Sequence, residues 1–460
     1  MADRAGAAGK RVAVIGGGWA GCAAAVELAA AGCAVTLFEQ APTLGGRARG
    51  VEVHGRMLDN GQHILLGAST ETLRLLRRVG VAPKTALRHQ PQQMRYPTGS
   101  GGMDFVAPRL PAPFHLAVAL VRAKGLARAD KLALARFSTT ARWMGWQLNV
   151  DCSVAELLER FDQTARLVRL MWRPLCLAAL NTPPESASAR VFLAVLRDSL
   201  GAGRAASDML LPRLDLHALF PAAAAAFIEG RGGVVRRGAR VTALMREGDS
   251  WRLDAAGKAV DGNTTGLFNA IVLAVAPPAA LTLLAGLPLG DTAERLAAFE
   301  YEPITTCYLQ YAPEVRLGLP FYALPDDPDK GHWGQFVFDR GQLDGEQAGL
   351  LSVVVSASNA AAALGQAALA EALAGQLAEL FGRPALAAPA WTQVITEKRA
   401  TFACTPGLLR LPVASGLPGL VLAGDYTESD YPATIETAVR SGAAAAKAII
   451  APGKSMRQNA

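Results

Sequence analysis

Short apolar runs and helix-like stretches alternate along most of the chain. Near the N-terminus, residues 12–15 form a β-branched apolar run, an alanine-rich stretch follows to about residue 31, and residues 34–38 form a second apolar run. The short runs are typical of buried strands and the longer stretch of a helix. Further predicted strands cover residues 270–276, 305–311, 350–356 and 420–423, and further helices cover residues 70–79, 187–196, 218–229 and 363–380. Strands that alternate with helices predict an α/β fold with a parallel, Rossmann-like sheet.

Other parts of the chain follow a less regular pattern. Further predicted strands cover residues 51–57, 234–244 and 391–401, with a pair of strands at 87–105. Residues 110–210 are mostly helical and rich in Leu, Trp and Met. Within them, Ser153 is expected to cap a helix, and Arg173-Pro174 to interrupt another. Such a helical cap suits the enclosure of a long apolar ligand, and it equally suits a plain domain core.

The glycines between the first two predicted strands have Gly-x-Gly-x-x-Gly spacing. Gly16 lets the chain turn tightly off the strand, and Gly18 lets backbone N–H groups approach a pyrophosphate. Gly21 lets the helix pack closely on the strand, and the N-terminus of this helix attracts an anion. Glu39 ends the second strand, where its carboxylate can accept hydrogen bonds from a ribose.

This order of elements predicts a dinucleotide-binding unit. The alternative is a strand–helix–strand unit with a purely structural role. The residues expected to contact the dinucleotide in this part of the chain are Gly16, Gly18, Trp19, Ala20, Gly21, Glu39 and Gln40.

The segment after Glu39 indicates which dinucleotide binds. Leu44-Gly45-Gly46-Arg47-Ala48 resembles the extended Gly-Gly motif of the amine oxidase and phytoene desaturase flavoprotein superfamily. In that superfamily the Gly-Gly-Arg segment continues the FAD site along the pyrophosphate. The resemblance therefore implies FAD as the cofactor, and the alternative is a glycine turn with a solvated arginine.

The C-terminal half supplies the rest of this site by the same resemblance. A valine in the superfamily binds adenine through backbone atoms, and Val241 is the candidate here. Gly424-Asp425 follows a predicted strand, and the superfamily's acid at that place binds FAD between the ribityl chain and the pyrophosphate. A helix from Thr434-Ile435 would point its N-terminus at the flavin, where the dipole stabilises negative charge on the reduced ring. Alternatively, Asp425 caps a turn.

The segment Leu58 to Gly67 carries the catalytic candidates. In the superfamily an Asp-x-Gly segment at this place leads the chain past the isoalloxazine ring. Gly61 is therefore expected at FAD, and Asp59, Gln62 and His63 near the flavin or the substrate. Asp59 could equally cap a turn and His63 could be a satisfied core histidine, and the sequence leaves these alternatives open.

Composition limits the class of protein. The chain has 460 residues, 51% of them hydrophobic, which is enough for two domains with large cores. Mean hydropathy is +0.21, yet no run has the pattern of a transmembrane helix, and the first ten residues show no secretory signal. The six cysteines are scattered, and no histidine cluster has metal-ligand spacing. These features predict reduced thiols in a cytoplasmic protein without a metal site.

Positive charge is concentrated in one part of the chain. The formal net charge is +7, and residues 71–150 contain 13 Lys and Arg but only three acidic residues. No segment resembles a nucleic-acid-binding motif. Within residues 110–137, Leu116, Ala119 and Leu120 form a predicted apolar face beside several cations. This pattern predicts peripheral contact with the inner membrane surface, and the alternative is an ordinary surface helix.

Four segments resemble one family within the superfamily. Residues 59–67, 171–184, 196–206 and 423–442 are similar to the hydroxysqualene dehydroxylase family, the squalene-associated FAD-dependent desaturases of hopanoid pathways. Arg173 departs from the pattern, since a smaller residue is expected there. The resemblance implies reduction of a C30 polyprenyl substrate, hydroxysqualene, to squalene by reduced FAD. It also implies an unidentified electron donor and, as further partners, other enzymes of squalene biosynthesis.

Two other functions stay open. A carotenoid or phytoene desaturase, or a flavin amine oxidase, would share the FAD fold, and Tyr426 and Tyr431 could supply an amine oxidase's aromatic cage. A non-catalytic flavin-fold protein that binds prenyl lipid or membrane is the second alternative.

The expected organisation interleaves two domains. An FAD-binding domain of the glutathione-reductase and amine-oxidase type is expected from three parts, residues 1–85, 211–290 and 411–450. An α+β substrate domain with the helical cap is expected from residues 86–210 and 291–410. Residues 451–460 are expected to form a flexible tail.

Overall fold

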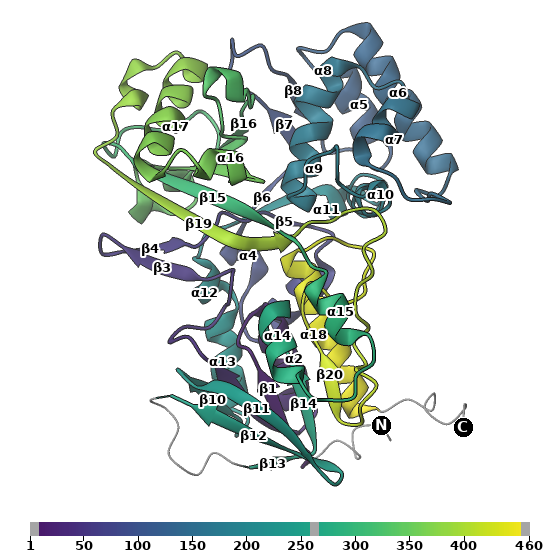
Figure 1. Ribbon diagram of the computed structural model, residues 1–460. Helices are drawn as coiled ribbons and strands as arrows, with labels where there is room; N and C mark the ends of the chain where they lie inside the picture. Colours follow the sequence, from purple (N-terminus) through teal and green to yellow (C-terminus); the bar gives the residue numbers. More distant parts are fainter. Residues whose placement is uncertain (1–8, 258–265, 452–460) are drawn as a thin grey trace.

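The computed structural model describes residues 9–257 and 266–451 and arranges them in three connected parts (Figure 1). A parallel sheet with its helices lies at the bottom of the view. A helical cap lies at the top right, and a lobe built on an antiparallel sheet lies at the top left. The expected flexible tail, apart from residue 451, lies outside the described residues.

The parallel sheet confirms the predicted α/β architecture. Its strand order is β10-β2-β1-β14-β20. The strands are β1 (Arg11–Ile15), β2 (Ala34–Glu39), β10 (Val234–Arg237), β14 (Ala270–Leu273) and β20 (Leu420–Leu422). Val12 and Val14 of the central strand pack into the core on one face, whereas Ala13 and Ile15 pack into the core on the other. Both faces are therefore covered, as is usual for parallel sheets.

Three helices cover one face of this sheet: α2 (Trp19–Ala30), α13 (Pro221–Glu229) and α18 (Ile435–Ile450). A Cβ on Gly442 of α18 would lie 2.1 Å from the backbone oxygen of Ala20 in α2, so glycine allows the two helices to touch. The other face packs against β11 (Arg240–Glu247), β12 (Ser250–Ala256), β13 (Leu267–Phe268) and α14 (Pro277–Leu284). A further helix, α15 (Thr292–Ala297), follows α14.

The top-left lobe contains an antiparallel sheet of strand order β16-β17-β18-β15-β19. Its strands are β15 (Tyr301–Gln310), β16 (Phe321–Ala323), β17 (Phe336–Asp339), β18 (Leu350–Ser356) and β19 (Trp391–Phe402). Leu369, Leu373 and Leu377 of one helix pack against the valines of this sheet. The helical segments are α16 (Asn359–Ala362), α17 (Gln366–Phe381), η2 (Pro328–Lys330), η3 (Arg340–Gln342), η4 (Gly345–Gln347) and η5 (Pro384–Ala387).

The helical cap forms around a cluster of aromatic rings. Trp172 lies 4.6 Å from Phe137 and 6.2 Å from Phe192, measured between ring centroids. The predicted cap at Ser153 is confirmed, because its Oγ accepts a hydrogen bond from the backbone N–H of Glu156 (3.1 Å). The segments are α5 (Phe114–Arg122), α6 (Arg128–Trp143), α7 (Val154–Arg160), α8 (Ala165–Leu167), the π-helical η1 (Val168–Trp172), α9 (Arg173–Leu180), α10 (Ala189–Ser199) and α11 (Arg204–Ser207).

Short elements connect the three parts. The strands are β3 (Gly50–Val53), β4 (Arg56–Asp59), β5 (Leu65–Leu66), β6 (Leu87–Gln90), β7 (Gln93–Arg95), β8 (Asp104–Val106) and β9 (Met209–Pro212). The helices are α3 (Thr70–Arg78), α4 (Pro83–Ala86) and α12 (Leu216–Leu219). The expected pair of strands within residues 87–105 is confirmed as β7 and β8, which pair antiparallel.

Three parts of the chain differ in detail from what the sequence predicts. Residues 51–57 are not one strand, because His54 and Gly55 both have positive φ and turn β3 back along β4. Arg173-Pro174 marks a change of helix type and not a break in the chain's helical course: the π-helical η1 ends at Trp172, and α9 begins at Arg173 with Pro174 in its first turn. Leu116, Ala119 and Leu120 form one apolar face, as predicted, but this face does not meet solvent or a membrane, because Ala119 is buried and the two leucines pack against the core.

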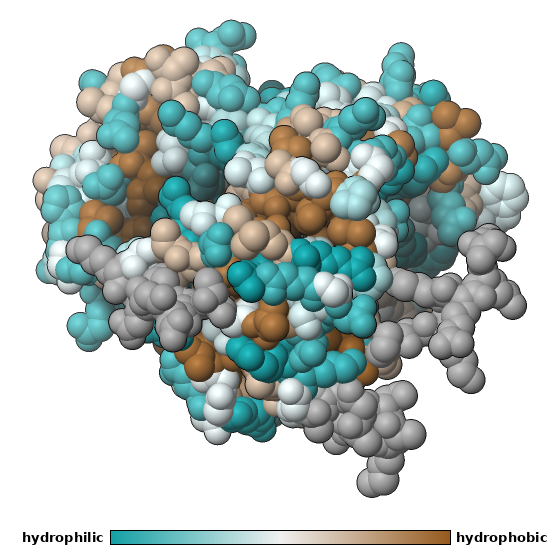
Figure 2. All heavy atoms as spheres, turned by 60° about the horizontal axis from the view of Figure 1, so that its bottom comes forward, coloured by the Kyte–Doolittle hydropathy of each residue, from teal (hydrophilic) through white to brown (hydrophobic). Residues whose placement is uncertain are grey.

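The face seen in Figure 2 alternates polar regions with apolar ones, and apolar side chains gather near the centre of that view. No helix in the described ranges is long and apolar enough to span a bilayer. All six cysteines are buried.

Candidate functional site

A cleft of about 790 Å³ opens where the strands of the parallel sheet end. Segments that directly follow β1, β2, β14 and β20 line it, together with parts of β11 and β19. Open α/β sheets bind ligands at this edge. The expected residues that line the cleft are Gly16, Gly18, Trp19, Ala20, Glu39, Gln40, Gly45, Gly46, Arg47, His63, Val241, Gly424, Asp425, Thr434 and Ile435. Gly21, Gly61, Asp59 and Gln62 are not among the lining residues.

The glycine turn between β1 and α2 is closely packed at Gly16 and Gly21 and open at Gly18. A Cβ on Gly16 would lie 2.4 Å from the backbone oxygen of Ala274, and a Cβ on Gly21 would lie 1.8 Å from that of Gly16. A Cβ on Gly18 would meet nothing within 4 Å. Gly18 begins α2 without a side-chain cap, so the positive end of the helix faces open space in the cleft.

The Gly-Gly segment lies directly against this turn. The N–H of Gly45 donates to the backbone oxygen of Gly17 (2.8 Å), and Gly18 and Gly45 form a parallel bridge. A Cβ on Gly46 would lie 3.2 Å from the Cα of Gly18. Two glycine-rich segments thus form one continuous wall of the cleft.

Glu39 links the end of β2 to the glycine turn. Its two carboxylate oxygens accept hydrogen bonds from the N–H groups of Gly17 and Ala41, each at 2.7 Å. The residue is only 8% exposed and lines the cleft next to Gln40. Each oxygen can accept a second hydrogen bond, so the carboxylate can also receive a hydroxyl from a ligand.

An ion pair joins a segment near the N-terminus to a segment near the C-terminus at the cleft. Arg47 Nη2 lies 2.7 Å from Asp425 Oδ1, and Arg47 Nη1 donates to the backbone oxygen of Ala400 (2.8 Å). Asp425 follows β20 and is nearly buried. The extended Gly-Gly motif and the Gly424-Asp425 turn therefore meet at one place, as the sequence predicts.

Two more of the predicted cofactor-binding segments, at Val241 and at Thr434-Ile435, also line the cleft. Val241 lies in β11 at a β-bulge, the irregularity that often re-aims backbone groups near binding sites. Thr434 caps α18, where its Oγ1 accepts the N–H of Thr437 (3.1 Å), and Ile435 begins the helix. The N-terminus of α18 thus points at the cleft.

His63 is the one catalytic candidate that lines the cleft. Its Nδ1 lies 2.7 Å from the backbone oxygen of Gly61, which accepts a hydrogen bond only if Nδ1 carries the proton. Nε2 is then left to accept or donate a further proton. Burial lowers the pKa of His63, the hydrogen bond to Gly61 opposes this shift, and the charge of Arg47 adds to it.

Asp59 and Gln62 lie behind His63 in a buried polar network. Arg340, whose side chain is 1% exposed, donates to Gln62 Oε1 (3.0 Å) and lies 3.9 Å from Asp59 Oδ2. Asp59 Oδ1 accepts the N–H of Leu216 (2.7 Å), and Tyr308 Oη donates to the backbone oxygen of Asp59 (2.9 Å). Burial raises the pKa of Asp59 to about 6, against the opposing charge of Arg340. This network holds the segment that presents His63.

Arg340→Met is expected to destabilise the protein by about 3–5 kcal/mol at pH 8, since it leaves the buried Asp59 carboxylate without its cation. The variant's Asp59 pKa will lie above its unfolded value of 3.8, so protonation stabilises the fold at low pH and this stability is lost as pH rises. The deficit, measured by urea unfolding, should therefore be smaller at pH 5 than at pH 8. Adding Asp59→Asn to this variant should recover part of the lost stability, because it removes the buried carboxylate. A double variant no more stable than Arg340→Met would contradict the pairing of Arg340 with Asp59.

Two tyrosines that the sequence did not assign to the FAD site also line the cleft, Tyr301 and Tyr426. Within the described residues, neither buried hydroxyl has a hydrogen-bond partner. Burial raises the pKa of both, so they remain protonated donors. Tyr426 directly follows Gly424-Asp425, which is a usable sequence signal, whereas nothing local marks Tyr301. Tyr431 is not among the lining residues, and the guanidinium of Arg440 lies 4.8 Å from the centre of its ring.

These features fit FAD. At Gly18 the start of α2 has no side-chain cap and faces open space, and the Glu39 carboxylate can accept a hydrogen bond. The buried hydroxyls of Tyr301 and Tyr426 have no hydrogen-bond partner within the described residues. A dinucleotide offers the matching groups, namely a pyrophosphate, ribose hydroxyls and the polar edge of a ring.

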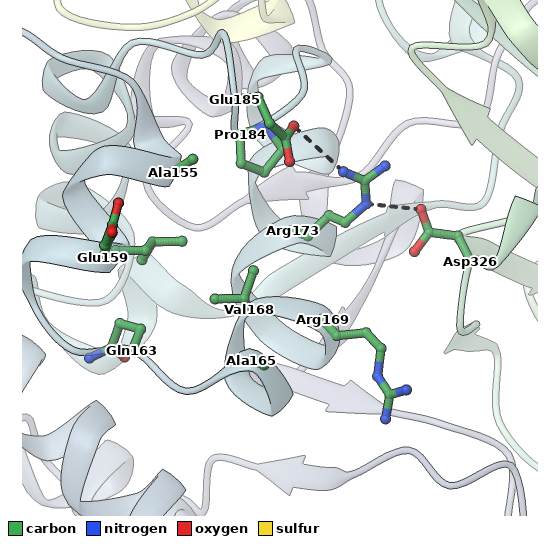
Figure 3. Close-up of a pocket in the computed structure, with 11 residues that line it drawn as sticks. Ala155, Glu159, Gln163, Ala165, Val168, Arg169, Arg173, Pro184, Glu185 and Asp326 are labelled. Atoms are coloured by element: carbon green, nitrogen blue, oxygen red, sulfur yellow. Dashed lines mark hydrogen bonds and ion pairs between the residues drawn. The ribbon is translucent and has the colours of Figure 1, made fainter.

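Arg173, the departure from the family pattern, lies outside this cleft (Figure 3). Its side chain extends between two acids: Nε lies 3.3 Å from Asp326 Oδ2 and Nη1 lies 3.7 Å from Glu185 Oε2. These residues line a separate pocket of about 480 Å³, and Arg169 points away from both acids. Arg173 thus connects α9 to the loop after β16.

Comparison with known proteins gives one matching family model and several curated relatives. The family model described as flavin containing amine oxidoreductase matches residues 19–450. A hydroxysqualene dehydroxylase from Rhodopseudomonas palustris is 32% identical, and the alignment covers 97% of this chain and 99% of that protein. A hydroxysqualene dehydroxylase from Sinorhizobium fredii is 29% identical, with 95% and 97% covered.

Solved structures share the fold. A triple mutant of putrescine oxidase superposes with a TM-score of 0.72, covering 96% of this chain and 99% of the oxidase. Its sequence is 19% identical, so this likeness concerns the fold alone.

Proposed function

The chain belongs to the flavin-containing amine oxidoreductase family and is an FAD-dependent oxidoreductase, and on this premise we propose that it reduces hydroxysqualene to squalene. The observation that carries the proposal is the similarity to hydroxysqualene dehydroxylases along almost the whole chain, including the cap and the lobe. In this reaction the allylic carbon loses its hydroxyl as water and gains one hydrogen, so one hydride and one proton are consumed. Reduced FAD supplies the hydride when it is bound.

In this proposal each part of FAD would be bound by a different group of cleft residues. The uncapped backbone N–H groups at the start of α2, beside Gly18, would hold the pyrophosphate, and Glu39 with Gln40 would hold the adenosine ribose. The backbone at Val241 would contact the adenine. Gly45, Gly46 and Arg47 would continue the site along the pyrophosphate, because Gly45 and Gly46 lie against the glycine turn. The residues at the flavin end would be Gly61, Gly424, Asp425, Thr434 and Ile435.

His63 gives the leaving hydroxyl its proton in this mechanism. The Gly61 oxygen fixes Nδ1–H, so a proton taken up by the ring lies on Nε2, the nitrogen that is free for the cleft. Loss of water then leaves an allylic cation stabilised by resonance. Asp59 and Gln62, through Arg340, act on His63 only by holding its segment in place.

Apolar side chains keep water away from this cation. Phe402 lines the cleft beside Tyr301, and the neighbouring cap is built around a large apolar core. Exclusion of water matters because water would add to the cation and regenerate the alcohol substrate.

The substrate also sets the proposed location. A C30 polyprenyl chain dissolves in membranes, so we place the protein in the cytoplasm, peripheral on the inner membrane surface. An electron donor that reduces FAD and other enzymes of squalene biosynthesis are its proposed partners.

The direction of electron flow tests the function. Under anaerobic conditions, hydroxysqualene added to the dithionite-reduced protein should restore the absorbance of oxidised flavin. Phytoene, ζ-carotene and putrescine added to the oxidised protein should leave that absorbance unchanged. Reduction of the flavin by a carotene or by the amine, with no response to hydroxysqualene, would instead support a desaturase or an amine oxidase.

A further inference from the structure

Large apolar side chains stay exposed on one part of the helical cap. Trp143 is 87% exposed, Val121 74%, Leu132 65% and Phe114 62%. These four residues belong to α5 and α6, and Leu110 and Val150 just outside the two helices are also exposed. Scattered single residues of this kind need no explanation, but a group within 41 consecutive residues does.

The exposed residues lie along two helix faces. Leu132 and Trp143 are eleven positions apart, which is three helical turns, so they share a face of α6 about 16 Å apart along its axis. Phe114 and Val121 share a face of α5 in the same way. Lys131 of α6 donates through Nζ to the backbone oxygen of Val121 (2.7 Å), so the end of α5 lies beside the first turns of α6. In Figure 1 the two helices lie next to each other in the upper part of the cap.

The charge on this surface has one sign. Exposed cations on or beside the two helices are Arg109, Arg122, Lys124, Arg128, Arg136 and Arg142. The acid of α6, Asp130, is 4% exposed and accepts hydrogen bonds from the N–H of Ala127 (2.8 Å) and the hydroxyl of Thr164 (2.6 Å). It therefore caps its own helix and leaves the outer cations uncompensated.

We propose that α5 and α6, with their exposed apolar residues and cations, form a docking surface for an anionic lipid bilayer. Trp143, Leu132, Val121 and Phe114 enter the boundary between head groups and acyl chains. The arginines and Lys124 contact phosphate head groups. The occupant is an anionic bilayer because it alone offers an apolar layer under a negative one. A nucleic acid would match the cations but would leave the aliphatic side chains in water.

This assignment differs from the face that the sequence predicts. Leu116, Ala119 and Leu120 pack inward, and the side chains that remain outside are on other positions of the same helices. It rests on the proposed function only in that a membrane-dissolved substrate explains why such a surface is needed.

Vesicle flotation tests the docking surface with the full chain. The wild type should bind phosphatidylcholine vesicles containing phosphatidylglycerol, and the double variant Leu132→Ser/Trp143→Ser should bind them about 100-fold more weakly. Arg136→Gln/Arg142→Gln should lose about fivefold per charge on anionic vesicles and little on pure phosphatidylcholine. Leu409→Ser is the matched control, because Leu409 is 68% exposed but lies outside the cap, and its binding should equal that of the wild type.

Three results would overturn the docking surface: undiminished vesicle binding by the Leu132→Ser/Trp143→Ser variant, tight binding of the wild type to DNA in place of vesicles, or a wild-type dimer that this variant converts to monomer. The proposed function is tested separately, since the variant should still convert hydroxysqualene presented in detergent at the wild-type rate. Normal vesicle binding without conversion would reject the function and retain the surface.

Discussion

Alanine at Gly18 is expected to give a folded protein that binds FAD at least about 100-fold more weakly than the wild type. Gly18 has φ −70° and ψ 178°, which alanine adopts freely, and its Cβ would meet no protein atom within 4 Å. The added methyl group would occupy the space that a pyrophosphate needs beside the start of α2. Thermal unfolding of the apoprotein and titration with FAD, followed by flavin fluorescence, measure the two effects separately.

Gly21→Ala is the contrasting variant. Its Cβ would lie 1.8 Å from the backbone oxygen of Gly16, so α2 would have to move away from β1 and the protein should be recovered unfolded or insoluble. Gly18→Ala with wild-type FAD affinity would show that the pyrophosphate does not lie at this turn.

His63→Gln is expected to lower the single-turnover rate of squalene formation by about 10²–10⁴-fold, with FAD still bound, because glutamine cannot deliver a proton. The pKa of His63 lies below its usual 6.5, so the protonated ring forms only as pH falls below that range. The wild-type rate should therefore rise as pH falls through the His63 pKa and then level off, and the variant should show no such rise. Rapid-quench measurements across this pH range test both statements.

His89→Gln serves as the control for this substitution, since His89 is exposed on β6, outside the cleft, and its loss should change nothing. If His63→Gln kept the wild-type rate and pH profile, the proton would have to come from another donor, and the hydroxyls of Tyr301 and Tyr426 would be the next candidates.

The site could be predicted from the sequence where its chemistry depends on local geometry. The requirement for glycine at Gly16, Gly18 and Gly21 arises within a single turn, and Glu39 ends the next strand. The spacing of these residues in the sequence is therefore enough to predict their roles. The meeting of Arg47 with Asp425 also follows, because both segments resemble parts of one known cofactor site.

The remaining residues could not be predicted because their roles depend on distant contacts. Arg340 reaches Gln62 and Asp59 from another part of the fold, and Tyr301 lies at the start of a strand with no motif around it. Helical periodicity placed Leu116 and Leu120 on an apolar face correctly, but periodicity does not say whether core or solvent faces that side.

The most direct test of the proposed reaction is product analysis after one anaerobic turnover in D₂O. Flavin reduced in D₂O carries exchangeable deuterium at the nitrogen that donates hydride, so the product should be squalene with one deuterium at the carbon that bore the hydroxyl. Mass spectrometry and NMR would locate that label. Squalene formed without it, or no squalene from the reduced, FAD-loaded protein, would contradict the account.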